Sequence, residues 1–266
     1  MAAIDEAADT HMQTIALHVE GGIAHLTMNR PERMNAMTNR MLVETHDCLE
    51  RIAVRSDVRV LVLTGAGRGF CPGADLKHYS AGESDIASEH RHFRVPVLLH
   101  RMPQVTIAAI NGPCAGAGCG WAAACDLRFA GAAATFNTAF LNVASAGDMA
   151  GPWFLPRLLG AAKARELYFL PEKFRAADAL AMGLVSRVFD DASLMPEVDA
   201  IAARLAAASP HALRTMKRNF VDAEMMDLDA YIQIESERHT QVMAHADAKE
   251  AFRAFVEKRP PKFGGG

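Results

Sequence analysis

Two loops of small residues could supply backbone groups for chemistry. Residues 65–76 follow the apolar run 58–64 and end near Asp75, which can cap a helix; residues 111–120 follow the apolar run 105–110. A strand that passes through a glycine-rich loop into a helix start directs unpaired backbone N–H groups toward a ligand, and the glycines let that ligand approach the main chain. Two such loops, each offering one N–H group, could hold a carbonyl oxygen that gains negative charge.

Asp148 is a candidate acid or base. It is the lone carboxylate in VASAGDMAGPWF (residues 143–154), whose other members are apolar or small. Desolvation among such neighbours is expected to raise the pKa of its carboxyl group, as at many catalytic carboxylates. The same aspartate could instead cap the helix expected to begin near Pro152, because aspartate is favoured ahead of a proline-led helix. The residues alone leave both roles open.

The elements that must position these groups alternate between strands and helices. Residues 14–20 and 23–28 alternate apolar and polar side chains around a Gly-Gly pair, which predicts a β-hairpin. Thr38 can cap a helix that runs to about residue 55. Residues 125–130 predict a further strand, and the pattern is helical from residue 193 onward.

The composition excludes several classes of protein. The 266 residues are 50% hydrophobic and 22% charged with a net charge of −3, which permits a sizeable core and shows no nucleic-acid signature. No apolar run of about 18 residues is present, so no membrane span is expected. The start lacks the basic and apolar regions of a secretory signal, and an odd number of cysteines without a C-x-x-C pair predicts reduced thiols in the cytosol.

Cysteine and histidine side chains raise a metal-site hypothesis that their spacing does not support. Cys71 and Cys119 lie in the two small-residue loops, but no histidine stands at ligand spacing from either, so both are interpreted as small buried side chains. His78, His90 and His92 occupy a polar stretch that is interpreted as a solvated helix and loop. We therefore predict no metal ligands.

Five segments resemble the crotonase (enoyl-CoA hydratase/isomerase) superfamily. They are NRPERMNA (29–36), GRGFCPGADL (67–76), AAINGPCAGAGCGWAAACDLRFA (108–130), WFLPRLLGAAKARELYF (153–169) and AADALAMGLVSRVF (176–189). They stand in the family's order, and the resemblance extends roughly from Thr14 to Phe263. It implies an α/β fold with a ββα superhelix core over residues 13–200 and a helical region over residues 201–266 that forms a trimer or hexamer. Residues 1–12 are expected to be a disordered tail.

The resemblance also implies a substrate and its contacts. The backbone N–H groups of Ala74 and Ala117 would hold the thioester oxygen of an acyl-CoA as an enolate forms. No other cofactor is implied, because coenzyme A is part of the substrate. Further substrate contacts are expected from Arg30, Arg33, Asp75, Leu76, Lys77, Gly116, Phe140 and Trp153. The acyl pocket is expected to be apolar, with Trp121, Met149 and Phe154 nearby.

The two glutamates that the family's hydratases use as acid and base have no counterparts here. Their positions correspond to Gly120 and Phe140, and neither can transfer a proton. Asp148 is the expected replacement, in an acyl-CoA lyase or isomerase. The alternatives are a dehalogenase or thioester hydrolase that uses Asp148 as a nucleophile, and a non-catalytic acyl-CoA-binding protein.

Overall fold

Residues 12–82 and 86–264 are described by the structure, a computed structural model of the chain. The tail predicted over residues 1–12 therefore lies outside the described residues, apart from Met12, which packs against the hydrophobic core. Within the two described ranges, no helix is long and apolar enough to cross a membrane.

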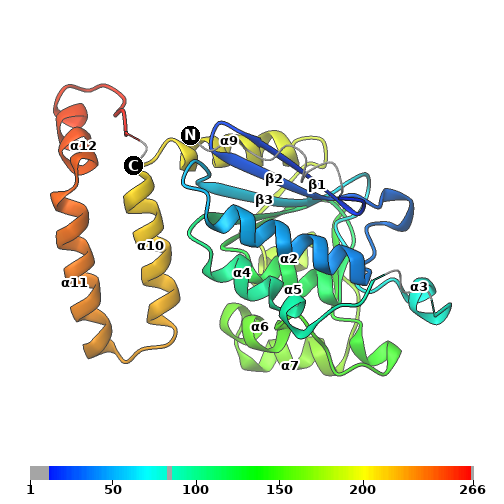
Figure 1. The fold of residues 1–266 in the computed structure, drawn as a ribbon. Coiled ribbons are helices and arrows are strands. Elements are labelled where there is room, and N and C mark those ends of the chain that lie inside the picture. Colours follow the sequence, from blue (N-terminus) through cyan, green and yellow to red (C-terminus); the bar gives the residue numbers. More distant parts are fainter. Residues whose placement is uncertain (1–11, 83–85, 265–266) are drawn as a thin grey trace.

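A six-stranded sheet lies at the centre of the fold (Figure 1). In spatial order its strands are β1 (Ile15–Glu20), β2 (Ile23–Met28), β3 (Val60–Gly65), β4 (Val105–Ile110), β6 (Leu127–Gly131) and β9 (Arg187–Phe189). β1 and β2 form the predicted antiparallel hairpin, and every other neighbouring pair is parallel. Because β3 and β4 are parallel neighbours, the two small-residue loops leave the same edge of the sheet.

Helices cover both faces of the sheet, which explains why β3 and β4 are buried along their whole length and are mostly apolar. One face packs against α2 (Asn39–Ala53), α4 (Val95–Arg101) and α5 (Ala117–Ala124), and the other packs against α9 (Leu194–Ala206). Successive side chains alternate between faces, so Leu61 and Leu63 join the first core while Val60 and Val62 join the second. The Thr38 hydroxyl accepts from the N–H of Met41, which confirms the predicted cap of α2.

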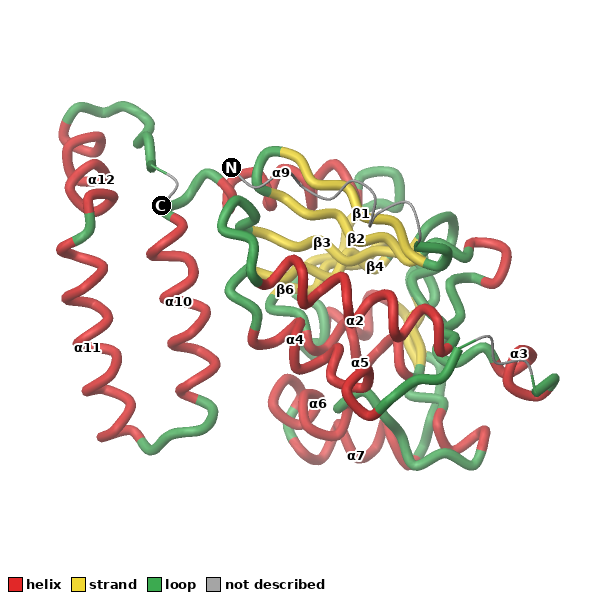
Figure 2. The backbone as a smooth tube through the Cα atoms, viewed as in Figure 1, coloured by secondary structure: helices red, strands yellow, loops and turns green. Residues whose placement is uncertain are grey.

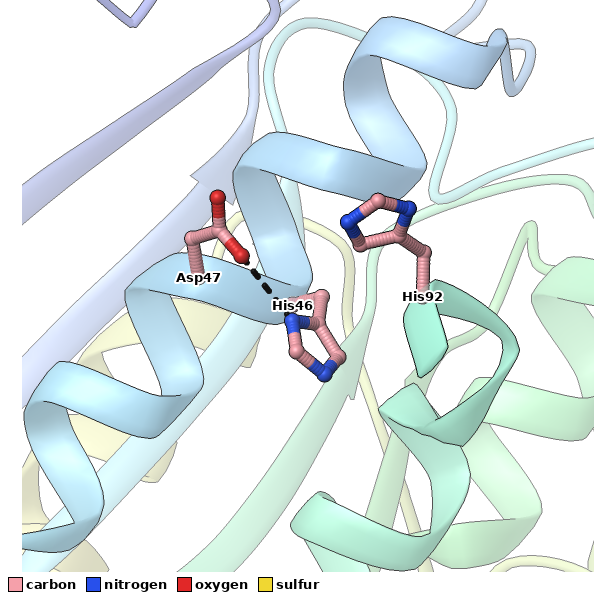
Figure 3. Close-up of side chains that lie close together, drawn as sticks. All are labelled: His46, Asp47 and His92. Carbon is pink, nitrogen blue, oxygen red and sulfur yellow. Dashed lines mark hydrogen bonds and ion pairs between the residues drawn. The ribbon is translucent and has the colours of Figure 1, made fainter. Parts of the chain in front are cut away.

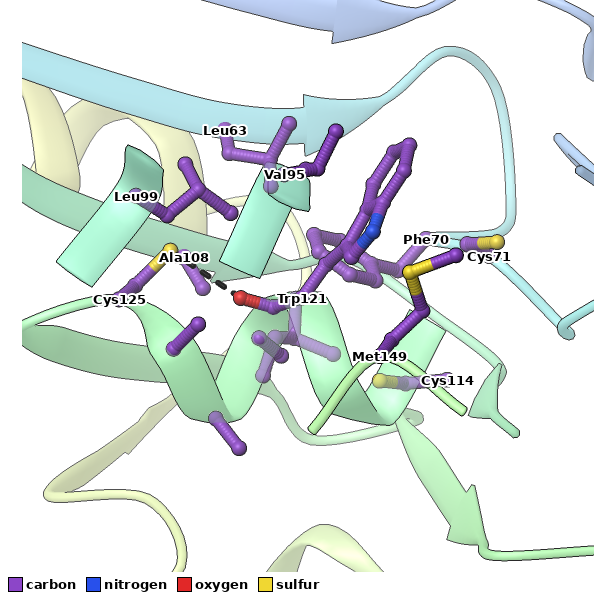
Figure 4. Packing of buried hydrophobic residues seen from close by; sticks show 14 of the residues in the cluster. Leu63, Phe70, Cys71, Val95, Leu99, Ala108, Cys114, Trp121, Cys125 and Met149 are labelled. Carbon is purple, nitrogen blue, oxygen red and sulfur yellow. Dashed lines mark hydrogen bonds between the residues drawn. The ribbon is translucent and has the colours of Figure 1, made fainter. Parts of the chain in front are cut away.

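Trp121 lies at the centre of the first core (Figure 4). Its side chain is fully buried on α5 and lies near Leu63 of β3 and Val95 of α4. A large aromatic side chain contributes much of the apolar surface that a core buries. This packing fixes α5, whose first residue is Ala117, against the end of β3.

A smaller sheet and four short helices complete the superhelical core. The sheet contains β5 (Cys114–Ala115), β7 (Thr135–Asn137) and β8 (Phe174–Arg175). The helices are η3 (Phe140–Val143), α6 (Gly151–Leu159), α7 (Ala161–Phe169) and α8 (Ala176–Ala181). Three further short helices, η1 (Pro31–Arg33), α3 (Leu76–Ser80) and η2 (His90–Arg94), lie in the connections between the longer elements.

The C-terminal helices extend away from this core (Figures 1 and 2). They are α10 (Pro210–Ala223), α11 (Leu228–Ala244) and α12 (Ala246–Val256). The boundary predicted at residue 200 falls inside α9, which packs on the central sheet, so the chain leaves the core only after α9. None of the residues of α11 is buried within the single chain.

A buried lysine attaches α10 to the core. Lys217 forms an ion pair with Asp126 at 2.8 Å and donates hydrogen bonds to the carbonyl oxygens of Leu99 and Gln104 at 3.1 and 2.7 Å. Burial lowers the pKa of Lys217, although the neighbouring Asp126 opposes that shift. Asp126, the residue before β6, therefore has a structural role.

Candidate active site

The two predicted donor loops meet through a single parallel bridge between Cys71 and Cys114. The N–H of Cys71 donates to the carbonyl of Pro113 at 3.0 Å, and the N–H of Ala115 donates to the carbonyl of Cys71 at 2.9 Å. Ala74 and Ala117 each lie three residues beyond this bridge, on their own loops. The structure therefore brings together the two residues that the sequence singled out as donors.

Gly73 and Gly116, the residues before the two donors, are in contact. A Cβ atom placed on Gly116 would lie 3.6 Å from the Cα atom of Gly73, and one on Gly73 would lie 3.1 Å from the carbonyl oxygen of Ala115. Both glycines have positive φ angles, 96° for Gly73 and 51° for Gly116. Glycine is needed here because other residues rarely adopt this backbone conformation.

Both donor N–H groups lack a backbone acceptor in the described part of the chain. Met37 bonds to the residues on either side of Ala74, because its N–H donates to Gly73 and its carbonyl accepts from Asp75, both at 2.8 Å. Ala117 is the first residue of α5, where an N–H has no partner inside the helix. Two unpaired N–H groups on adjacent loops are the kind of groups from which an oxyanion site is built.

Arg30 and Asp75 form an ion pair directly beside the first donor. Their side chains form a largely buried ion pair at 2.9 Å, and Arg30 also donates to the carbonyl of Ala36. Burial alone would raise the pKa of Asp75, but the N–H of His78 and the Arg30 guanidinium outweigh burial and lower it. Asp75 caps α3, as predicted. Arg30 was predicted as a substrate contact, and the structure shows it paired with Asp75 and Ala36.

Three predicted contact residues near the Arg30–Asp75 ion pair are exposed: Arg33, Leu76 and Lys77. Leu76 and Lys77 begin α3, which projects from the core on the side opposite the C-terminal helices (Figure 1). The Arg33 charge acts on Asp75, so Arg33 lies close to the start of α3. These side chains are accessible to a phosphate group.

Asp148 lies in a strained turn and does not cap α6. The N-cap of α6 is Ala150, and no side chain makes a capping hydrogen bond there. Met149 and Ala150 have φ angles of 50° and 59°, which are unfavourable for residues other than glycine. Desolvation raises the pKa of the Asp148 carboxyl group, although its side chain still reaches solvent. The sequence left open a role for Asp148 as the cap of α6, and the structure shows that Asp148 does not have this role.

The turn at Asp148 packs directly against α5. A Cβ atom on Gly120 would lie 2.5 Å from the carbonyl oxygen of Met149, so only glycine allows this approach. The Asp148 charge also helps to raise the pKa values of Cys71, in the first donor loop, and Tyr168, on α7, after the larger effect of burial on each. Asp148 thus lies within electrostatic range of the first donor loop.

Gly120→Ala is expected to destabilise the fold by about 1–3 kcal/mol, because the new Cβ atom would overlap the Met149 backbone. Helix propensity alone predicts the opposite sign, since alanine is favoured over glycine inside a helix by about 1 kcal/mol. The measurement is urea unfolding of the variant beside Gly264→Ala, where an added Cβ atom meets nothing within 4 Å. A more stable Gly120→Ala protein would contradict this packing.

Two aromatic side chains lie between the donors and Asp148. Phe140 stacks on Tyr168 with ring centroids 5.8 Å apart, and a Cβ atom on Gly116 would lie 3.7 Å from the Phe140 ring. A Cβ atom on Gly147, the residue before Asp148, would lie 3.1 Å from the Tyr168 ring. Phe140 was predicted at the site, but Tyr168 was not, because its place on α7 follows only from the tertiary packing.

The other predicted aromatic contacts are placed elsewhere. The Trp153 ring packs on His100 and Phe154, and the Arg157 guanidinium lies 3.8 Å from its centre. None of these partners belongs to the donor loops, so Trp153 packs against the core instead of lining the site. The core also contains the buried side chains of Trp121, Met149 and Phe154. Of the aromatic residues predicted at the site, Phe140 is therefore the one that lies beside the donors.

The cysteines near the donors are suited to packing. Burial raises the pKa of Cys71 to about 12, so this thiol stays protonated and is a poor nucleophile at neutral pH. Cys119 is half-buried, and its thiol donates to the carbonyl of Cys114 at 3.0 Å. The interpretation of Cys71 as a small buried side chain is confirmed.

His92 is buried and not solvated, which corrects the sequence interpretation for that residue. It lies edge-on to His46 of α2, and Asp47 bonds to the Nδ1 atom of His46 at 3.0 Å (Figure 3). The Nδ1 atom of His92 accepts from the N–H of Glu89 at 2.8 Å. The proton of a neutral His92 ring therefore sits on Nε2, whereas a metal ligand must present an unprotonated nitrogen. These contacts favour a packed histidine pair over a metal centre.

Two N–H groups without a backbone acceptor thus lie on adjoining loops, and Asp148, whose carboxyl pKa is raised by partial burial, lies within electrostatic range of the first loop. The family model for enoyl-CoA hydratase/isomerase matches residues 18–266. The chain therefore belongs to this family, the crotonase superfamily, and is an acyl-CoA-processing enzyme with the predicted mixed α/β fold and C-terminal helical region.

Individual relatives align with this chain along almost its whole length. It is 34% identical to the 1,2-epoxyphenylacetyl-CoA isomerase of Escherichia coli (strain K12), over 96% of this chain and 99% of the relative. It is also 34% identical to the (E)-benzylidenesuccinyl-CoA hydratase of Thauera aromatica, over 94% and 99%. The crystal structure of an enoyl-CoA hydratase from Bacillus anthracis superposes with a TM-score of 0.88 at 30% identity, over 96% of this chain and 100% of that one.

Proposed function

We propose that this enzyme is an isomerase that moves a double bond along an acyl-CoA chain, with Asp148 as its single acid and base. The carboxylate takes a proton from one acyl carbon, and the charge passes to the thioester oxygen held by Ala74 and Ala117. The protonated carboxyl then returns the proton two carbons further along the chain. The atoms balance, and no second catalytic group is needed.

Asp148 carries this proposal because, among the described residues, it is the carboxylate near the two donors that forms no ion pair, whereas Asp75 is held by Arg30. Hydration requires a water molecule to be held and split between a base and an acid, and the side chains at Gly120 and Phe140 offer neither. Proton return needs only one group that alternates between its two protonation states. Desolvation raises the pKa of Asp148, which makes its protonated form more accessible than that of an ordinary aspartate and so favours that alternation.

Coenzyme A would lie across the exposed start of α3. Lys77 and Arg33 are exposed and positively charged, so they can bind its phosphates. Arg30 forms the ion pair with Asp75, the residue after Ala74, and so fixes the position of Ala74. Phe140 and Tyr168 would make the acyl pocket apolar and partly aromatic. The E. coli relative, by name an isomerase of 1,2-epoxyphenylacetyl-CoA, supports isomerisation over hydration and an aromatic acyl group.

The test is turnover of a panel of CoA thioesters. A β,γ-unsaturated acyl-CoA incubated in D₂O should give the α,β-unsaturated isomer, and enoyl-CoA thioesters should add water far more slowly. Release of halide from a haloaroyl-CoA, or of free CoA, would instead identify Asp148 as a nucleophile. Tight thioester binding without turnover of any member would identify a non-catalytic binding protein and overturn the proposal.

The activity should fall on acidification at a pH above the ordinary aspartate range. The base must be ionised, and desolvation raises the pKa of Asp148, so kcat/KM is expected to decline as pH falls through that raised value. An unperturbed aspartate would hold the activity down to about pH 3.9. The measurement is the pH profile of kcat/KM, and a profile flat down to the ordinary range would contradict the assignment.

We also propose that the enzyme assembles as a trimer or a pair of trimers. The C-terminal helices expose apolar side chains that one chain leaves uncovered, including Phe220 at 72% exposed, Leu228 at 76% and Phe255 at 85%. Such a surface is typical of an interface. Light scattering should give a mass that is a multiple of three protomers, and a stable monomer at micromolar concentration would contradict the prediction.

A further inference from the structure

A separate cavity lies behind the aromatic pair, between the turn at Asp148 and the helices α6 and α7. Its volume is about 350 Å³, within the range of about 300–1,000 Å³ that is usual for small-molecule sites. Its lining includes Ala146, Pro152, Pro156, Ala161, Arg165 and Tyr168. None of these residues belongs to the donor loops, and the proposed reaction assigns the cavity no role.

Tyr168 joins this cavity to the active site. The residue lines the cavity, and its ring also stacks on Phe140, which in turn lies against Gly116 beside the second donor. The hydroxyl of Tyr168 occupies the space where a side chain on Gly151 would lie, since a Cβ atom there would be 1.9 Å away. Tyr168 thus borders both the turn that carries Asp148 and the cavity, with Gly147 and Gly151 leaving room for it.

The lining indicates what the cavity could hold. Alanine and proline side chains make most of its wall, and Arg165 is the one charged residue among the described lining. Such a surface favours an apolar group, and a guanidinium can lie over the face of an aromatic ring. The volume suits a phenyl-sized group but not a nucleotide. Ala146, two residues before Asp148, places the cavity within reach of an acyl chain held at the carboxylate.

We propose that this cavity receives the distal end of the acyl group, an aromatic ring or a similarly bulky apolar end, and that Tyr168 selects for it. The inference rests on the proposed function, because it takes the acyl chain to run from the donors past Asp148. An acyl group too short to reach Tyr168 makes no contact with the cavity. The cavity therefore sets which acyl groups bind well and leaves the chemistry at Asp148 unchanged.

The test compares two adjacent alanines of α7. Ala161 lines the cavity, whereas Ala162 is exposed and outside its lining, so Ala161→Phe fills the cavity and Ala162→Phe is the matched control. Calorimetry would give Kd for phenylbutanoyl-CoA and butanoyl-CoA, saturated thioesters that lack the double bond to be moved. Ala161→Phe should weaken binding of the phenyl thioester by about tenfold or more and leave the short one within about twofold. Ala162→Phe should change neither.

Equal effects of Ala161→Phe on the two thioesters, or no effect on either, would overturn the cavity assignment while the proposed function stands. Failure of the unsubstituted enzyme to bind any CoA thioester would overturn the proposed function itself. Ala146→Phe fills the cavity from the other wall and is expected to show the same selective loss. Because Ala146 is exposed and outside the helices, this second variant does not depend on the folding of α7.

Discussion

Asp148→Asn is expected to lower kcat/KM by about 10²–10⁴, the usual contribution of a positioned acid or base. Asparagine keeps the size of the side chain but cannot carry the proton between the two carbons. Affinity for a saturated acyl-CoA should stay within about twofold, because the donors at Ala74 and Ala117 are untouched. The control is Asp190→Asn, an exposed aspartate after β9, which should retain full activity.

The same variant should not lose stability. Desolvation raises the pKa of Asp148 in the folded chain, so the ionised carboxylate opposes folding above that pKa and has no effect below the unfolded value. Asparagine has no charge to desolvate, so its Tm at neutral pH should equal or exceed that of the unsubstituted protein, with the difference vanishing in acid. An early-melting variant with normal turnover would instead make Asp148 a purely structural residue.

Ala117→Pro is expected to reduce turnover by about 10²–10³ or more, the usual cost of losing one oxyanion donor. Proline replaces the N–H hydrogen with a ring carbon, so it removes the donor and also adds bulk where the thioester oxygen would lie, while it is well tolerated as the first residue of a helix. The thioester oxygen would then be held by Ala74 alone. Single-turnover rates with a β,γ-unsaturated acyl-CoA, in a variant whose folding is checked by circular dichroism, provide the measurement.

A matched proline at another helix start separates loss of the donor from a general effect of proline. Ala246 is the exposed first residue of α12, far along the chain from the donor loops, so Ala246→Pro should keep normal rates. Normal rates in a folded Ala117→Pro enzyme would show that Ala117 is not an oxyanion donor. If Ala117→Pro does not fold, the same rates are measured for Ala74→Pro, which removes the other donor.

Much of the fold could be predicted because it follows from local patterns. Apolar runs bounded by glycine predict the strands β3 and β4, and a capping threonine predicts α2. The donor positions could be predicted as well, since an N–H group at a loop-to-helix junction needs no particular side chain. The boundary at residue 200 lies within α9 because a helical pattern does not reveal whether its apolar face meets the sheet or leaves it.

The family and the absence of glutamate at Gly120 and Phe140 follow from the sequence alone, as do the two positions proposed as donors. Only the tertiary structure decided that Arg30 serves Asp75, that Asp148 does not cap α6, and that Tyr168 stands beside Phe140. The physical reason is that backbone donors are set by local geometry, whereas a side chain's role depends on partners distant in the sequence. Arg30 and Asp75 are 45 residues apart, and their ion pair becomes visible only when the chain is folded.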